Sequence, residues 1–183
     1  MAKRSYDDPE REEQRLEALS LVHQHGDPVL RTPARAVTVF DDALKIEADR
    51  MIEVMDSARG VGLAAPQVGR LSRLLVARPF TDEPAYALCN PTIVWRSDEE
   101  ETDTEGCLSI GEVSVPVTRA VAIRVEAVDI DGEAVTLEAD TFEARVLQHE
   151  IDHLDGILIL DRTTAEARRE ALRELREGPA DAE

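Results

Sequence analysis

The segment QHEIDHLDG, residues 148–156, carries the side chains with the clearest capacity for chemistry in this sequence. His149 and His153 are four positions apart, so on a helix they share one face and both imidazoles can bind a single metal ion. Glu150 is turned about 100° from His149, near such an ion but not necessarily bound to it. Histidines at the surface or satisfied by carbonyl groups are the alternative, yet a metal ion is the simplest compensation for burying these groups.

A catalytic metal normally has three protein ligands and an open position for water, so a third ligand is needed. Cys107 stands in EGCLS, beside a glycine and a polar turn that can present its thiol. Cys89 stands in the apolar run YALCNPTIVW, where we expect a small buried side chain. The pattern favours a site of Cys107, His149 and His153, with donors that suit Zn²⁺ or Fe²⁺. A later glutamate, as in HExxH metalloendopeptidases, is the alternative third ligand.

Apolar periodicity predicts which elements position these residues. Apolar side chains recur at helical spacing after Asp41 and predict a helix that ends before Gly60. Short strand-like runs follow at 71–78, 86–96 and 120–129, and Asp131-Gly132 predicts a hairpin to residues 133–139. The acidic stretch 98–105 is expected to be a solvated loop.

The two histidines belong to a helix predicted from about Phe142 to Leu154. A capping box of Asp140 and Glu143 would open this helix, and Gly156 would end it. Because the helix is apolar on most sides, we expect it to be central. These elements predict an α+β fold in which small antiparallel or mixed sheets pack around that helix, and a last helix that is amphipathic and mostly solvated.

Length and charge restrict the range of functions. With 183 residues and 43% hydrophobic side chains, the chain is expected to form a single domain. A formal net charge of −18 argues against direct binding of nucleic acid. The charged start MAKRSYDDPEREEQR and the absence of a run of 18 apolar residues argue against a secretory signal and a membrane span, so we expect a cytoplasmic protein. Residues 1–18 are expected to be a loose charged extension or a frayed helix.

Three motifs in this order carry a resemblance to a known family: GVGLAAPQ at 60–67, EGCLS at 105–109 and HEIDHLDG at 149–156. Together they strongly resemble peptide deformylase. The resemblance implies a catalytic domain over residues 19–163, followed by a C-terminal helix and tail over 164–183.

The resemblance implies an activity and a cofactor. Peptide deformylases remove the formyl group from the N-terminal formylmethionine of new polypeptides and release formate. The metal would be held by Cys107, His149 and His153. In the family it is usually Fe²⁺, often replaced by Zn²⁺, Ni²⁺ or Co²⁺, and the partners would be formyl-methionyl peptides and nascent chains.

The resemblance also implies roles for further residues. Glu150 would take a proton from the attacking water and return it to the departing amine. The side-chain amide of Gln67 and the backbone N–H of Leu108 would face the oxygen that becomes negative. Gly62 would let the backbone approach the substrate main chain. The methionine pocket would be walled by Val61, Leu108 and Val146. Residues expected to orient the site are Glu105, Arg119 and Asp152.

Other readings of the same motifs remain open. GVGLAA with Asp82 imitates a dinucleotide-binding fingerprint, but it follows a predicted helix and Pro66 interrupts the next one. An HExxH metalloendopeptidase and a metal-binding protein without turnover are the functional alternatives. Gly111 replaces the proline usual in the family, which leaves the course of residues 111–118 open. Residues 161–183 hold five bases and seven acids, so the tail does not support stable ribosome attachment.

Overall fold

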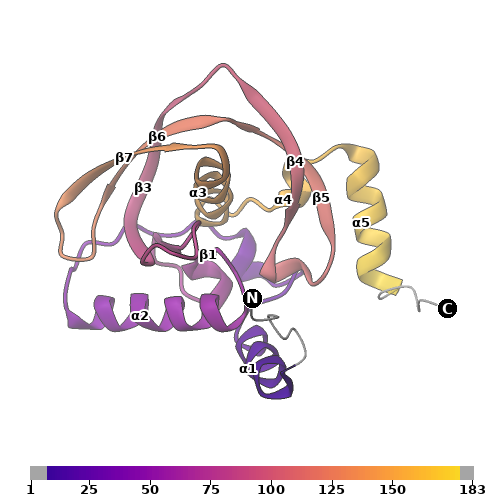
Figure 1. The fold of residues 1–183 in the computed structure, drawn as a ribbon, viewed down its shortest axis with the longest axis horizontal. Helices are drawn as coiled ribbons and strands as arrows, with labels where there is room; N and C mark the ends of the chain where they lie inside the picture. The colour runs from indigo at the N-terminus through magenta and orange to yellow at the C-terminus, as the bar shows by residue number, and fades with distance from the viewer. Residues whose placement is uncertain (1–7, 178–183) are drawn as a thin grey trace, which may run out of the picture.

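Helix α3 (Thr141–Leu154) lies in the middle of the molecule, enclosed by the strands of two antiparallel sheets (Figure 1). The computed structural model describes residues 8–177. The expected α+β architecture around a central histidine helix is confirmed. No helix of the described part is long and apolar enough to cross a membrane.

A five-stranded sheet forms the larger layer, in the order β1-β2-β3-β6-β7. Its strands are β1 (Gly62–Ala64), β2 (Leu74–Ala77), β3 (Tyr86–Arg96), β6 (Ala122–Val128) and β7 (Ala134–Asp140). All four residues of strand β2 are buried. Because successive side chains point in opposite directions, the strand is buried on both faces. Leu75 joins the cluster around α3, whereas Leu74 joins the cluster around helix α2 (Asp42–Ser57). The sheet therefore lies between the two helices.

The smaller sheet pairs β4 (Glu100–Gly106) with β5 (Ser114–Ala120). Alternate residues of β5 pack with α4 (Ile159–Arg162) and α5 (Ala165–Glu177) in a separate apolar cluster. The expectation of a loop over 98–105 is wrong. This acidic segment forms most of β4, because its backbone pairs with β5 along the whole strand while Glu100, Glu101 and Asp103 stay in solvent and only Glu105 is buried.

The N-terminal part of the described chain is helical, which is one of the two forms expected for residues 1–18. Residues Pro9–Ser20 form a helix, α1, whose first turn is capped by the Asp8 carboxylate. The helix contacts α2 and buries Ala18, and this tertiary contact stabilises a segment whose composition alone favours disorder. The rest of the predicted extension, residues 1–7, and the end of the tail, residues 178–183, lie outside the described residues.

Local signals at helix starts were only partly reliable. The Asp41 carboxylate accepts a hydrogen bond from the Leu44 N–H at 3.1 Å, so Asp41, which precedes the apolar pattern in the sequence, caps α2. The predicted capping box of α3 is wrong. Asp140 makes no side-chain cap, and the Glu143 carboxylate accepts a hydrogen bond from the Tyr86 hydroxyl instead. Three short 3₁₀ helices complete the fold: η1 (Pro28–Arg31), η2 (Ala65–Val68) and η3 (Leu108–Ile110).

Candidate metal centre and active-site cavity

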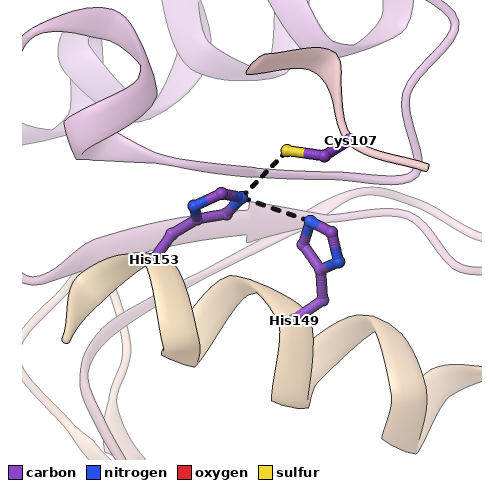
Figure 2. A group of neighbouring side chains, drawn as sticks. All are labelled: Cys107, His149 and His153. Carbon is purple, nitrogen blue, oxygen red and sulfur yellow. Dashed lines mark hydrogen bonds between the residues drawn. The ribbon is translucent and has the colours of Figure 1, made fainter. Parts of the chain in front are cut away.

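Three potential ligand atoms converge between α3 and the turn that follows β4 (Figure 2). The Cys107 Sγ atom lies 3.2 Å from the His153 Nε2 atom, which lies 3.2 Å from the His149 Nε2 atom. All three lie within 4.8 Å of one another. The cysteine comes just after β4, 42 positions before His149 in the sequence, and the fold brings it to the helix.

The donor set fits a divalent cation. Tetrahedral coordination with metal–nitrogen bonds of about 2.0–2.1 Å and a metal–sulfur bond of about 2.3 Å separates neighbouring ligand atoms by about 3.3–3.6 Å. The two short separations in the cluster are close to this range. Desolvation by burial lowers the pKa of His153, which keeps its imidazole neutral and able to donate a lone pair. A thiolate and two neutral imidazoles are ligands suited to Zn²⁺ or Fe²⁺.

Glu105 orients the second histidine. Its Oε2 atom lies 3.0 Å from the Nδ1 atom of His149. A carboxylate can only accept, so Nδ1 carries the proton. Burial lowers the pKa of His149, but hydrogen bonds with Cys107 and Glu105 outweigh burial and raise the pKa well above its ordinary value, so a cation bound at Nε2 would displace a proton from that atom. Burial raises the pKa of Glu105, but hydrogen bonds from His149 and Arg119 outweigh burial and lower the pKa to about 2. The orienting group is therefore a carboxylate at neutral pH.

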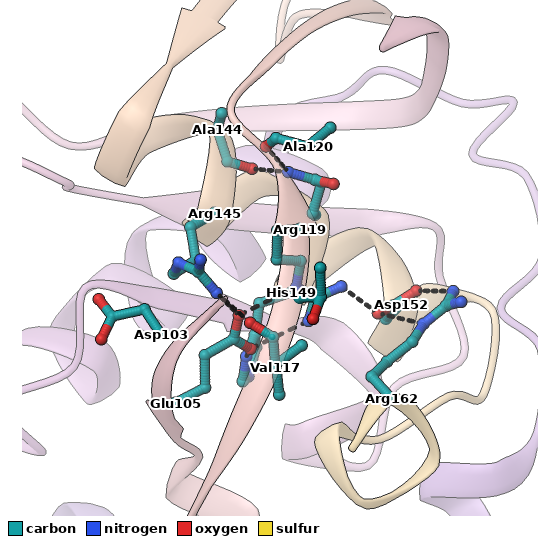
Figure 3. A network of polar contacts seen from close by, with 12 residues as sticks. Asp103, Glu105, Val117, Arg119, Ala120, Ala144, Arg145, His149, Asp152 and Arg162 are labelled. Atoms are coloured by element: carbon teal, nitrogen blue, oxygen red, sulfur yellow. Dashed lines mark hydrogen bonds and ion pairs between the residues drawn. The ribbon is translucent and has the colours of Figure 1, made fainter. Parts of the chain in front are cut away.

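Three arginines neutralise the buried carboxylates behind the histidines (Figure 3). Arg119 donates to both oxygens of Glu105, at 2.9 and 3.0 Å, and to Asp152 at 2.5 Å. Arg145 donates to Glu105 at 2.8 Å, and Arg162 binds both oxygens of Asp152. The network joins β4, β5, α3 and α4, so it holds the elements that carry the ligands in one arrangement.

Gln67 reaches the cluster from the 3₁₀ helix after β1. Its Oε1 atom accepts the Ala64 N–H at 2.8 Å, which fixes the orientation of the amide. The Nε2 atom donates to the Ser109 hydroxyl at 3.1 Å and lies 3.7 Å from the Cys107 Sγ atom. Leu108, half-buried, is the first residue of η3 directly after Cys107. Gln67 and Leu108 thus both lie beside the Cys107 sulfur, and each has an N–H group that can donate a hydrogen bond.

Glu150 lies beside the cluster and is 4% exposed. Burial raises the pKa of its carboxyl group to about 7. A bound cation would lower this pKa again. Its Oε2 atom is buried and has no hydrogen-bond partner among residues 8–177, so it remains available to a small polar molecule. The other side of the carboxylate packs against Gly62, where a Cβ atom would lie 2.4 Å from Oε1.

A cavity of about 660 Å³ opens onto this cluster. Cys107, His149 and Glu150 line its inner part, and the same cavity is bordered by the residues predicted to contact substrate: Val61, Gly62, Gln67, Leu108 and Val146. Glu105 also borders the cavity, whereas Arg119 and Asp152 lie behind it in the network of Figure 3. The structure thus brings every residue predicted for the site into one region.

The sequence analysis missed two residues of the network, Arg145 and Arg162. Arg145 is four positions before His149, so it lies on the same helix face one turn earlier. That spacing within an otherwise apolar helix was a usable signal. Arg162 is brought to Asp152 by the turn after α3, and no spacing rule places it there.

An α+β domain with a buried cysteine, two histidines and an unpaired carboxylate at the base of an open cavity has the features of a metal-dependent hydrolase. Residues 19–169 match the family model described as polypeptide deformylase. The chain belongs to this family of enzymes, whose members remove formyl groups from polypeptides and bind a catalytic metal.

Individual relatives agree with this assignment. The chain is 48% identical over 145 residues to a peptide deformylase of Dictyoglomus thermophilum, covering 79% of this chain and 93% of the relative. The crystal structure of a peptide deformylase from Synechococcus elongatus in complex with actinonin superimposes with a TM-score of 0.81 at 40% identity, covering 87% and 88% of the two chains. The enzyme from Thermotoga maritima gives a TM-score of 0.76 at 45% identity, covering 78% and 96%.

Proposed function

We propose that this protein hydrolyses the N-formyl group of formylmethionine at the start of nascent polypeptides and releases formate. The observation that carries the proposal is the convergence of Cys107, His149 and His153 beside the unpaired Glu150 carboxylate at the base of the cavity. A divalent cation held by these three ligands would acidify a water molecule and polarise the formyl carbonyl.

Glu150 acts as the base and then as the acid. Its carboxylate takes the proton of the attacking water and delivers it to the amine that leaves as the new N-terminus. One carboxyl group can do both within one turnover, because it gains a proton from the water in the first step and gives the same proton to the amine in the second. The carboxylate is held near the cluster by contact with Gly62 and by its place directly after His149.

Gln67 and Leu108 stabilise the oxygen that becomes negative during the attack. The Gln67 amide has two N–H groups, one directed at Ser109 and one toward the side of Cys107. The second N–H and the backbone N–H of Leu108 donate to the developing oxyanion. Because Ala64 holds the amide oxygen, the donor is oriented before substrate binds, which avoids reorganisation during the reaction.

The peptide binds in extended form along the free edge of β1. The Ala64 N–H points away from β2, toward Gln67, and residues two apart in a strand direct their backbone groups alike. The backbone groups of Gly62 therefore face away from β2, on the side of the cavity that it lines. The methionine side chain is bordered by Val61, Leu108 and Val146.

The proposal is tested by measuring formate release from a formyl-Met-Ala-Ser peptide with anaerobically prepared protein. We expect turnover by the native protein and a loss of about 10²–10⁴-fold in Glu150→Gln with unchanged metal content. Turnover that survives Glu150→Gln would remove the proposed base. Release of internal peptide fragments in place of formate would indicate the alternative of a metalloendopeptidase.

The ligand set is tested separately. Cys107→Ala is expected to lose its stoichiometric metal, measured by elemental analysis after gel filtration, whereas Cys89→Ala in the core keeps it. If Cys107→Ala kept its metal and its activity, the third ligand would be a carboxylate and not Cys107. Within the described chain, the geometry supports Cys107, since the ligand cluster includes no residue of α5.

We propose Fe²⁺ as the native ion and the cytoplasm as the location, where formylated chains are synthesised. An iron ion held by a thiolate is sensitive to oxygen. The iron form is therefore expected to lose activity in air faster than the Ni²⁺ or Co²⁺ form, measured as half-lives of formate release. Equal half-lives for the three metal forms would argue against iron.

A further inference from the structure

Helix α1 forms one wall of the active-site cavity, although most of it precedes the residues that match the family model, 19–169. Arg15, Leu19 and Ser20 of this helix line the cavity. The helix is held in place by its contact with α2 and by the buried Ala18 side chain. This chain therefore adds to the cavity a surface that the deformylase motifs do not include.

Two guanidinium groups meet on this wall. Arg15 comes from α1, and Arg59 comes from the turn that ends α2, directly before the segment Gly60-Val61-Gly62. The carboxylate of Glu12 binds both, with Nη1 of Arg15 at 2.8 Å and Nη2 of Arg59 at 3.2 Å. Both arginines line the cavity, whereas Glu12 is not among its lining residues.

Arg15 and Arg59 have N–H groups that Glu12 does not engage. Each guanidinium has five N–H groups, and Glu12 engages one nitrogen of each. One carboxylate between two guanidiniums leaves a net charge of +1 at this wall. An anionic group on a bound peptide is therefore drawn to the α1 side and repelled by the exposed Asp103 of β4, which also lines the cavity.

We propose that Arg15 and Arg59 form a subsite for a carboxylate on the peptide substrate, beyond the formylmethionine; this proposal rests on the deformylase function proposed above. Planar guanidinium groups bind carboxylates in bidentate geometry. The carboxylate comes either from an Asp or Glu side chain that follows the methionine or from the C-terminus of a short peptide. Nascent chains that begin with formyl-Met and an acidic residue are then preferred substrates.

The expected size of the effect is modest because both arginines are partly solvated. Their side chains are 27% and 43% exposed, and exposed ion pairs contribute about 0.2–1 kcal/mol. Such a contribution corresponds to a preference of about 1.4- to fivefold at low ionic strength, and screening reduces it as salt is added. The preference is expected mainly in KM, since the subsite lies away from the reacting atoms.

The test compares C-terminally amidated formyl-Met peptides that carry Glu or Gln at the second or third position. For the native protein the Glu/Gln ratio of kcat/KM is expected to be about 1.4 to 5 at 20 mM salt and to approach one at 500 mM salt. The double substitution Arg15→Gln with Arg59→Gln is expected to bring the ratio to one. Arg15→Lys keeps the charge and should retain most of the preference.

Arg11→Gln is the matched control, because Arg11 is an exposed arginine of the same helix that does not line the cavity. It is expected to keep both the native ratio and the native activity. A second arm compares free-acid with amidated Gln peptides, and a preference confined to this arm assigns the subsite to the peptide C-terminus.

A ratio of one in both arms for the native protein, or a preference that persists in the double variant, overturns the subsite. Absence of formate release from every peptide, the amidated Gln peptides included, contradicts the deformylase function instead. The two failures are therefore distinguishable in one set of measurements.

Discussion

Individual atomic contacts determine the positions of the reactive groups in this site. Gly62 and Glu150 illustrate this, because the carboxylate occupies the space that any side chain at position 62 would need. His149 is set in its tautomer by one contact with Glu105, and Gln67 is set in its orientation by one contact with Ala64. Glu150, His149 and Gln67 thus each have a contact that orients them, which is what a site with defined geometry requires.

Gly62→Ala tests this at the residue scale. The new Cβ atom would meet the flexible end of Glu150, at 2.4 Å from Oε1, so the carboxylate is expected to move rather than the backbone. A displacement of about 1 Å costs about 10²-fold in rate. We expect kcat/KM for a formyl-Met peptide to fall by about this factor, with metal content and melting temperature close to native values. A variant with native activity would show that the position of Glu150 is not critical.

Helix α3 is the element on which the site depends most, since it carries both histidines, Glu150 and part of the ion network. Its apolar side packs against the large sheet, while its polar side faces β4, β5 and α4. Asp152 connects the polar side of α3 to β5 and α4, because it accepts hydrogen bonds from Arg119 of β5 and Arg162 of α4. The helix is therefore fixed on one side by burial and on the other by charge.

Asp152→Asn tests the contribution of this link. Removing one partner of a buried ion pair leaves an uncompensated charge and costs about 3 kcal/mol. We expect urea denaturation to show a loss of about this size in the free energy of unfolding. Glu170→Gln is the matched control, since the Glu170–Arg173 pair is 70% and 65% exposed and is expected to contribute less than about 0.5 kcal/mol. Equal effects of the two substitutions would refute a structural role for the buried network.

At the scale of the whole molecule, the metal centre joins two apolar clusters. Cys107 belongs to the cluster formed by β5, α4 and α5, whereas the helix of the two histidines packs in the cluster of the large sheet. Three protein ligands on one ion would cross-link these two parts. An ion that binds only the folded arrangement stabilises it by mass action.

Metal removal is therefore expected to lower thermal stability as well as activity. At a metal concentration about 100-fold above the dissociation constant, binding contributes about 2.7 kcal/mol. For a chain of this size that corresponds to a decrease of about 5–10 °C in melting temperature on adding a chelator. Scanning calorimetry before and after chelation, with recovery on adding Zn²⁺, measures the effect. An unchanged melting temperature in Cys107→Ala treated in the same way is the control, because that variant has no ion to lose.

Most strands and helices near the site could be predicted from local patterns, since their apolar periodicity is strong. The exceptions have physical causes. Strand β4 was taken for a loop because it exposes acidic side chains and depends on backbone pairing with β5. For residues 1–18 a loose extension and a frayed helix were both left open, because composition does not reveal the contact of α1 with α2. Arg145 was overlooked because its partner Glu105 is 40 positions away in sequence.

The sequence by itself determined that His149 and His153 share one helix face and that Glu150 adjoins them, because covalent geometry within a helix sets these distances. It also determined, through three ordered motifs, the family to which the chain belongs. Only the tertiary structure decided that Cys107 reaches the two imidazoles, that two carboxylates are buried among three arginines, and that α1 borders the cavity. These contacts join residues far apart in the chain, so they depend on how the sheets and helices pack and not on any local spacing.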